Sequence, residues 1–444
     1  MSSEKSKPRR FRPTYLIPLV VVGFALFVYL SPAGKRGESG PSGQSGTGQP
    51  NGVVAAVEKS ACNEDSASLQ QASVLNREGM SLLKKGLNAE AESAFSQALA
   101  LQDAPALKEC PAVVSTLIPL AALQREKGDP EQAEVLLQRA LAVLEKAHGP
   151  EHIEVAKVLE HIGTTLKDRG ALIEAAETIN RALRIRNKVQ GGSHPDTTQS
   201  LNTLGVIKRK LAAYSESEAL FMMALEITKK SPESDPRAVA GIMENLAVLY
   251  RTQGLLENAG LMMSQALQVL EKGLGVDHPD NAVIMHNLAT IRMAQGAYEK
   301  AEALFSRSLQ LAETTFGAEH QEVASSLNSL AGLYLAQRRY FDAYPLLVRA
   351  LSIREKSQSN APLSVAETLN NLGYVQAAVG DLTEADTSYG RAMAIAEAHL
   401  PANHPHLARL LNNHAQVVRV LGRTEEAAMM KKRSEEIMST LPQS

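Results

Sequence analysis

The sequence predicts an all-α protein, a solenoid of nine helical hairpins placed after an N-terminal transmembrane helix and a flexible linker. A small residue recurs every 42 positions, and a second small column follows twelve positions later, with no insertion or deletion between copies. The first column is Gly79, Ala121, Gly163, Gly205, Ala247, Ala289, Ala331, Gly373 and Ala415. The second column is Ala91, Ala133, Ala175, Ser217, Ala259, Ala301, Ala343, Ala385 and Ala427. A constant period of this length is typical of hairpins that stack side by side, each packing on its neighbours.

The first 31 residues differ in composition from the rest of the chain. Residues 1–13 form a basic tail, and residues 14–31 are an uncharged apolar run that would be roughly 27 Å long as a helix, close to the thickness of a bilayer. Five Lys and Arg residues precede this run and two follow it. This asymmetry predicts a single-pass anchor with a cytoplasmic N-terminus and extracytoplasmic repeats, periplasmic if the source is bacterial. A second interpretation is a signal peptide, cleaved near Ser31 and Ala33, that leaves a secreted protein.

Three further segments complete the domain organisation. Residues 32–66 form a linker whose first part is rich in Gly, Ser and Pro and is too polar to bury a core. Residues 69–434 hold the nine repeats, and residues 435–444 form a C-terminal tail.

The only two cysteines, Cys62 and Cys110, flank the first repeat. If that repeat is a helical hairpin, its second helix returns the chain to the end where the first helix began, so the two thiols can meet. In an oxidising compartment they are a possible disulfide. The alternative is that both remain unpaired small hydrophobic side chains.

Each unit is predicted to contain two helices. With the Gly79 column counted as position 8, the apolar residues at positions 4, 7, 8 and 11 share one face of a first helix. A glycine such as Gly170 then ends that helix in most units. The second helix alternates small and bulky columns, for example Ala301, Phe305 and Ser308, which lets neighbouring helices interdigitate.

These features resemble the tetratricopeptide repeat, whose W-x2-L-G-x2-Y and A-x3-F patterns the units follow without the Trp. The period is 42 residues, against about 34 for the common form of that repeat. Segments such as 244–250 (ENLAVLY) and 369–374 (LNNLGY), and loops of the His278-Pro279-Asp280 kind, look like the repeats of kinesin light chains. The resemblance implies a right-handed superhelix whose first helices line a concave groove for an extended peptide. Kinesin light chains begin with a heptad coiled coil for the motor, which this chain replaces with an apolar run and a linker, so attachment to a motor does not carry over.

Polar residues form rows beside the buried stripe of the first helices, where the concave wall is expected. An Asn amide both donates and accepts, so a row of them can hold the main chain of an extended peptide, and neighbouring arginines favour carboxylates or a C-terminus. The predicted groove residues are Asn202, Arg209, Arg251, His286, Asn328, Asn370, Tyr374 and Asn412. The alternative is that the asparagines bond helix ends or one another within the stack, and that the basic residues form a solvated face.

Composition and missing motifs disfavour several function classes. The formal net charge is −2 and aromatic residues are 4% of the chain, so nucleic acid is not a predicted partner. The motifs of nucleotide-binding proteins, serine hydrolases and zinc proteases are missing, so the protein is not predicted to be an enzyme and no cofactor is predicted. Five histidines, one per unit in the same loop phase, lie too far apart to share a metal ion. They are His152, His194, His278, His320 and His404.

The function predicted from the sequence is a membrane-tethered scaffold that binds a protein partner, as an extended peptide segment, in its concave groove. Two alternatives come from other classes. One is a soluble cargo adaptor of the kinesin light chain kind, and the other is a small-ligand-binding or enzymatic superhelix. The latter requires titratable groups that converge in one repeat, whereas the polar positions of this chain repeat along the axis.

Overall fold

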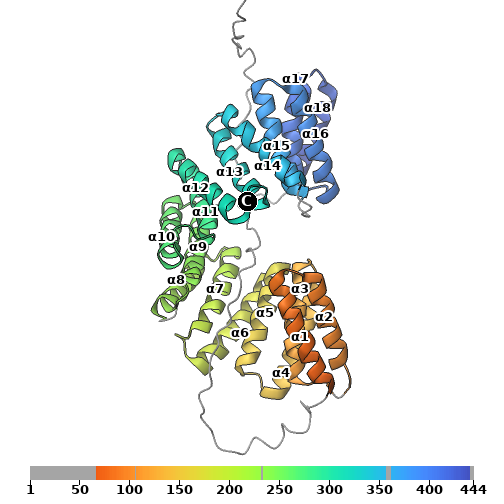
Figure 1. Cartoon of the computed structure of the whole chain (residues 1–444), viewed down its shortest axis with the longest axis vertical. Coiled ribbons are helices and arrows are strands. Elements are labelled where there is room, and N and C mark those ends of the chain that lie inside the picture. The colour runs from red at the N-terminus through yellow and green to blue at the C-terminus, as the bar shows by residue number, and fades with distance from the viewer. Residues whose placement is uncertain (1–66, 106, 232–233, 357–361, 441–444) are drawn as a thin grey trace, which may run out of the picture. The chain divides into compact units, whose positions relative to one another are not determined.

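The computed structural model describes residues 67–105, 107–231, 234–356 and 362–440, and these contain eighteen α-helices and one short 3-10 helix, η1 (Pro111–Val113) (Figure 1). The α-helices are α1 (Ala67–Lys85), α2 (Asn88–Gln102), α3 (Val114–Glu126), α4 (Pro130–His148), α5 (Ile153–Arg169), α6 (Leu172–Gln190), α7 (Pro195–Lys210), α8 (Tyr214–Lys230), α9 (Pro236–Thr252), α10 (Leu256–Leu274), α11 (Asp280–Ala294), α12 (Tyr298–Phe316), α13 (Gln321–Ala336), α14 (Tyr340–Lys356), α15 (Pro362–Val379), α16 (Leu382–His399), α17 (Pro405–Val420) and α18 (Thr424–Ser439).

The N-terminal segments of the prediction, residues 1–13, 14–31 and 32–66, lie outside the described residues. In the part of the chain that the structure describes, every helix is too short or too polar to cross a bilayer.

The predicted period is confirmed, since each odd-numbered helix forms a hairpin with the even-numbered helix that follows, giving nine hairpins over the described residues. The small columns lie where these helices meet. Ala301 of the second column is fully buried. At Gly205 of the first column an added Cβ would come within 2.6 Å of the Phe221 ring, so the bulky side chain of α8 requires the glycine on α7.

A left-handed residue ends the first helix in each of these hairpins. Gly170 has φ 86° there, and its backbone N–H donates to the Leu166 carbonyl. Two units place a different residue at this position, and Ala212 and Arg338 both take φ 59°. The turn geometry is therefore kept even where glycine is replaced, at a cost in backbone strain.

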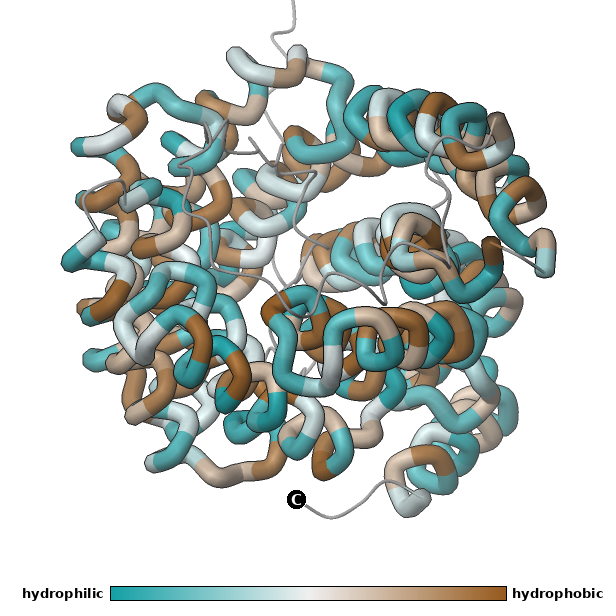
Figure 2. Tube along the Cα trace, turned by 90° about the horizontal axis from the view of Figure 1, so that it is seen from below, coloured by the Kyte–Doolittle hydropathy of each residue, from teal (hydrophilic) through white to brown (hydrophobic). Residues whose placement is uncertain are grey.

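The described chain divides into two compact units, and the division falls between residues 266 and 267, inside α10. In the first unit, consecutive first helices contact one another from α1 through α3, α5 and α7 to α9, and in the second unit α13, α15 and α17 do the same. No pair of second helices in the described residues makes contacts of that extent. The first helices therefore lie on the inner side of each unit. Figure 2 shows hydrophobic residues in brown recurring between hydrophilic residues in teal along the helices, as expected for helices with one buried stripe.

Candidate binding face

Three of the predicted groove asparagines accept a hydrogen bond from another asparagine 43 positions later, on the next first helix. The pairs are Asn245 to Asn202 at 2.8 Å, Asn371 to Asn328 at 3.2 Å and Asn413 to Asn370 at 3.1 Å. We call these pairs the amide ladder. The amides thus bond one another within the stack, which is the alternative that the sequence left open.

In other units, the residue at the repeat position of Asn202 also forms a hydrogen bond with the next first helix. Asn76 hydrogen-bonds with the hydroxyl of Thr116 on the next first helix, with N···O and O···O distances of 2.8 and 3.0 Å. The Ser200 hydroxyl donates to the Glu160 carboxylate at 2.6 Å. Polar side chains at this position therefore set the register between neighbouring hairpins. The partner residues were not among the predicted site residues, although adjacent asparagines such as those in 369–374 were a visible signal.

Three groove residues in the second unit do not belong to the ladder, and two of them are His286 and Asn412. His286 on α11 is half-buried and meets the ring of Phe305 edge to face, with centroids 5.3 Å apart. Burial lowers the pKa of His286 to about 4, so the imidazole is neutral at pH 7. Asn412 lies on α17, the last first helix, and makes no side-chain hydrogen bond to another described residue. Its amide is therefore open to a partner.

Tyr374 on α15 lies against another tyrosine. Its ring meets that of Tyr340 at 62° with the centroids 6.2 Å apart. Burial, followed by the field of Tyr340 and a hydrogen bond with it, raises the pKa of Tyr374 to about 12. The phenol therefore stays protonated and can act as a donor or acceptor at neutral pH.

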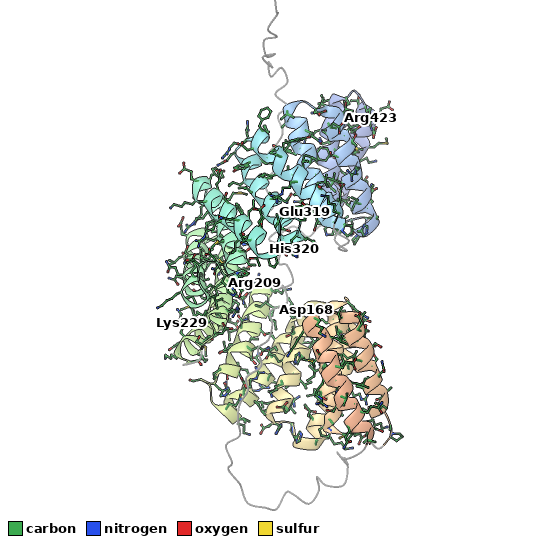
Figure 3. The ribbon with its side chains drawn as sticks, in the orientation of Figure 1. Asp168, Arg209, Lys229, Glu319, His320 and Arg423 are labelled. Atoms are coloured by element: carbon green, nitrogen blue, oxygen red, sulfur yellow. The ribbon has the colours of Figure 1, made fainter. Side chains whose placement is uncertain are left out.

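The basic row lies on the first helices of the first unit. Arg125 and Lys167 share the carboxylate of Asp168, at 3.4 and 3.3 Å. Arg209 on α7 and Arg251 on α9 are half-buried, and no carboxylate among the described residues forms an ion pair with either. Arg209 and Asp168 are labelled in Figure 3, near the C-terminal ends of α7 and α5.

The electrostatics of Arg209 and Arg251 are those of an uncompensated pair. Burial, followed by the positive charge of Arg251, lowers the pKa of Arg209. Burial also lowers the pKa of Arg251. Both guanidinium groups nevertheless remain charged at neutral pH, because an arginine pKa starts above 12. Two half-buried cations near one another form a local site for an anion.

The predicted Asn202 lies two helical turns before Arg209 on the same side of α7. Its Oδ1 accepts from Asn245, while its NH2 group makes no hydrogen bond to another described residue. Asn202, Arg209 and Arg251 therefore offer only donors toward the inner side of the first unit.

Comparison with known families identifies the repeats. The tetratricopeptide repeat model matches residues 70–146, 112–188, 154–230, 280–356 and 364–440, and a second model of the same repeat matches residues 239–280. The chain belongs to the tetratricopeptide repeat family. No protein with a curated description matches the sequence.

Several solved structures are distantly similar. BtubC (BKLC) from P. vanneervenii is 25% identical, with a TM-score of 0.47 over 52% of this chain and 94% of that one. A putative kinesin light chain from Podosopora anserina with nearly identical repeats is 23% identical, with a TM-score of 0.41 over 47% of this chain and 99% of that one. The apo quorum sensor NprR from B. thuringiensis is 14% identical, with a TM-score of 0.53 over 83% of this chain and 99% of that one. The family match confirms the resemblance to the tetratricopeptide repeat that the sequence indicated.

The loop histidines of these tetratricopeptide repeats have a structural role that the sequence did not reveal. Before five first helices the Nδ1 of a His residue accepts from the backbone N–H two positions later at 3.1–3.2 Å. The histidine is the N-cap in four of these helices, whereas in α11 the N-cap is Pro279 and His278 precedes it. The five histidines are His152, His194, His278, His320 and His404. Within the described residues, no group of His, Cys, Asp and Glu side chains is arranged to hold a metal ion.

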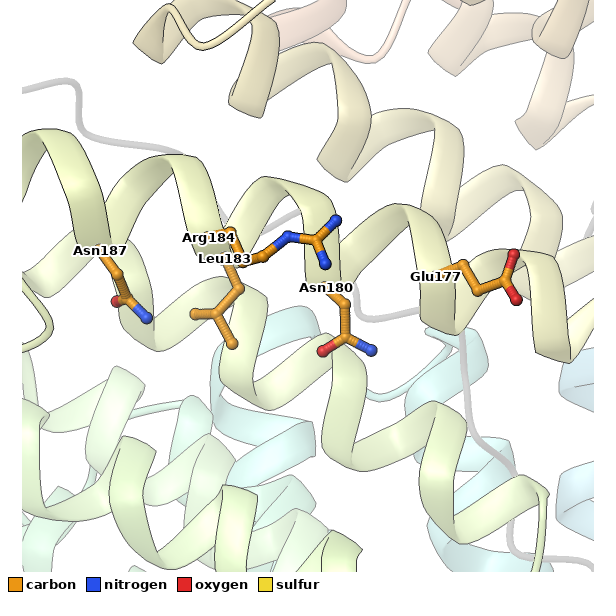
Figure 4. A pocket seen from close by; sticks show the side chains of 5 residues that line it. All are labelled: Glu177, Asn180, Leu183, Arg184 and Asn187. Carbon is orange, nitrogen blue, oxygen red and sulfur yellow. The ribbon is translucent and has the colours of Figure 1, made fainter.

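A surface pocket of about 480 Å³ lies beside α6, and the described side chains that line it all come from that one helix (Figure 4). They are Glu177, Asn180, Leu183, Arg184 and Asn187. Because they follow one another along a single helix, they do not converge on a common point. The geometry of these five residues therefore gives no support to the small-ligand or enzymatic alternative.

Cys110 precedes η1 and is buried with Leu69 and Leu107. The sulfur of Cys110 is disulfide-bonded. Cys62, the other cysteine of the chain, lies outside the described residues, so the pairing of these two residues stays a prediction.

Proposed function

We propose that this tetratricopeptide protein is a scaffold whose inner face, in residues 67–266, binds an extended acidic segment of a protein partner. The observation that supports the proposal is the pair Arg209 and Arg251, two half-buried guanidinium groups without a carboxylate in ion-pair distance among the described residues. The stack has supplied Asp168 to the preceding cations, Arg125 and Lys167, but no acid to this pair.

An incoming carboxylate removes an electrostatic cost that the free protein carries. Two like charges that are partly withdrawn from water repel one another and have lost part of their hydration. A carboxylate that bridges them compensates both terms, and Arg pairs favour the bidentate geometry that carboxylates offer. Asn202 adds an amide NH2 that can reach a main-chain carbonyl of the same segment. Asn202, one of the amides that the sequence assigned to the peptide, thus contributes through its Nδ2 donor, since its Oδ1 acceptor is occupied by the ladder.

Membrane tethering is the second part of the proposal, and it rests on the apolar run at residues 14–31 with the basic tail before it. In this arrangement the N-terminus is cytoplasmic, and the linker at 32–66 carries the repeats on the other side of the membrane. The test compares the full chain with a chain that begins at residue 67. Resistance of the full chain to carbonate extraction, with release of the shorter chain, is expected. Extraction of the full chain into the soluble fraction would favour the soluble adaptor or the secreted protein.

The binding test uses a fluorescein-labelled peptide of ten glutamates and the full chain in detergent. We expect Arg251→Gln to weaken binding by about tenfold or more, because a desolvated charge pair is lost at the centre of the site. Lys300→Gln is the matched control, since it removes the same charge from an exposed position on α12, and it should change the affinity by less than about twofold. Equal losses in the two variants would reject the site and leave only non-specific attraction. The wild type should also lose affinity with added salt more steeply than Arg251→Gln.

A further inference from the structure

Six pairs of neighbouring second helices are joined by one recurring ion pair. An arginine of the later helix contacts an acidic residue 36 positions earlier, on the preceding second helix, at 2.5–3.0 Å. The pairs are Arg139 with Asp103, Arg181 with Glu145, Arg307 with Glu271, Arg349 with Glu313, Arg391 with Glu355 and Arg433 with Glu397. We call this contact the second-helix clamp.

The clamp also holds a loop. Four of the clamp arginines also donate a hydrogen bond from Nη2 to a backbone carbonyl 31 positions earlier, at N···O distances of 3.1–3.3 Å. The acceptors are the carbonyls of Lys108, Pro150, Val276 and Ala318. Each of these carbonyls lies in the connection between a second helix and the next first helix. One arginine therefore ties two hairpins and the loop between them.

Two adjacent interfaces lack both members of the clamp. Between α6 and α8 the two positions hold Asn187 and Met223, and between α8 and α10 they hold Lys229 and Gln265. Met223 is 53% exposed, so the apolar side chain at the arginine position stays largely in solvent. No ion pair among the described residues joins α6 to α8 or α8 to α10.

These two interfaces belong to the hairpins that carry Arg209 and Arg251. On the first-helix side the hairpins α7/α8 and α9/α10 are joined by the bond from Asn245 to Asn202. On the second-helix side the clamp that joins other hairpins is missing. An interface that is held by a hydrogen bond on the first-helix side, and by no ion pair on the second-helix side, can open by rotation about the first-helix side.

We propose that hairpins α7/α8 and α9/α10 form a compliant joint, hinged on the amide ladder, whose opening and closing sets the spacing of Arg209 and Arg251. This inference rests on the proposed function for its ligand, an acidic peptide segment. Repulsion between the two guanidinium groups favours the open joint, and a bridging carboxylate favours the closed one. Binding and joint closure are then coupled.

The first experiment installs the missing clamp and measures hydrogen exchange of the full chain without ligand. Lys229→Glu with Gln265→Arg creates an acid and an arginine 36 positions apart across the interface between α8 and α10, which joins the hairpins that carry Arg209 and Arg251. We expect exchange of the backbone amides in residues 234–242 to slow by about threefold to tenfold, the range of a surface ion pair plus one hydrogen bond. The matched control removes a clamp, with Glu313→Asn and Arg349→Met, and exchange in residues 317–326 should accelerate to a similar degree. Unchanged exchange in residues 234–242, with acceleration in the control, would overturn the joint.

The second experiment separates the joint from the binding site. The ten-glutamate peptide should slow exchange in residues 234–242 of the wild type but not of the variant with Arg209→Gln and Arg251→Gln, which should keep the fast exchange of the free protein. In the clamp-installed variant, peptide affinity should rise by about threefold or more, because the clamp holds the joint in the closed state that the peptide favours. The two substitutions make the net charge one unit more negative, so non-specific attraction to the acidic peptide does not account for a rise. If the peptide fails to bind the wild type, the proposed function fails while the exchange comparison still decides the joint. Equal peptide affinity in the clamp-installed variant and the wild type would overturn the coupling.

Discussion

Asn413 donates a hydrogen bond from Nδ2 to the Oδ1 of Asn370, 3.1 Å away and 43 positions earlier. The period of the chain is 42, so the donor lies one residue beyond the position equivalent to the acceptor. The offset places the two amides on facing sides of adjacent first helices. The amide ladder therefore fixes the register between hairpins in addition to any contact that it makes with a partner.

We expect Asn370→Ala to destabilise the second unit by about 1–2 kcal/mol, because it leaves the half-buried amide of Asn413 without its acceptor. Asn412→Ala is the matched control, since Asn412 makes no side-chain hydrogen bond to a described residue, and its cost should stay below about 0.5 kcal/mol. Urea unfolding followed by circular dichroism measures both. Equal costs in the two variants would mean that the ladder does not hold the hairpins together.

His286 predicts a loss of stability in mild acid. Its pKa is about 4 in the folded protein, whereas an unfolded histidine has a pKa near 6.5. Below pH 6.5 the unfolded chain therefore binds a proton that the folded chain does not, so stability falls as the pH drops from about 6.5 to about 4. A shift of this size corresponds to about 3 kcal/mol of stability. His286→Asn, which introduces the residue found at this position in α13, α15 and α17, should remove this part of the pH dependence in thermal melts between pH 4 and 7. A variant that keeps the full acid sensitivity would assign the effect to other groups.

Replacing a capping histidine should remove one hydrogen-bond acceptor from the N-terminal end of its helix. The backbone N–H of Glu322 donates to Nδ1 of His320 at 3.2 Å, and the His320 ring stacks on Phe316 with centroids 4.7 Å apart. We expect His320→Ala to cost about 1 kcal/mol, the usual value of an N-cap. His320→Asn supplies another acceptor but no ring, so its cost should be smaller. Thermal melts at pH 7 give the order, and an equal or larger loss in the Asn variant would mean that the acceptor at residue 320 does not stabilise the helix end.

The sequence predicted the period, the two helices of each unit and the small columns, because these depend on packing between residues at fixed spacing. It could not decide how the amides at 202, 328 and 370 are used. The pattern of one helix identifies the face of a residue but not the distance to the next helix. The second-helix clamp was missed for the same reason, since Arg349 and Glu313 lie 36 positions apart and meet only through the stack. The pair Arg209 and Arg251 was predicted as part of the groove, and the structure adds that no described carboxylate compensates it.

Arg186 and Arg354 occupy the same position in repeats that lie four apart. Replacing each of them should lower the free energy of unfolding by a different amount. Arg186 donates to the Ser200 hydroxyl at 2.6 Å and lies 3.4 Å from the carboxylate of Glu160, whose side chain is 3% exposed. Arg186→Met leaves that buried carboxylate without a cation, and we expect a loss of about 3–5 kcal/mol. Arg354 lies 3.8 Å from Glu367, whose side chain is 33% exposed and keeps its contact with water. Arg354→Met should therefore cost about 1–2 kcal/mol, mainly through the hydrogen bonds to Ser364 and Thr368.

Hydrogen exchange resolves the two losses, because each arginine belongs to a different compact unit of the chain. The Arg186 variant should exchange faster in α5 to α7, and the Arg354 variant in α14 and α15. Glu160→Gln in the Arg186→Met background should recover part of the loss, since it removes the charge that the first substitution left buried. Glu367→Gln in the Arg354→Met background should recover little. Equal recovery in both backgrounds would mean that burial of the carboxylate does not decide the cost.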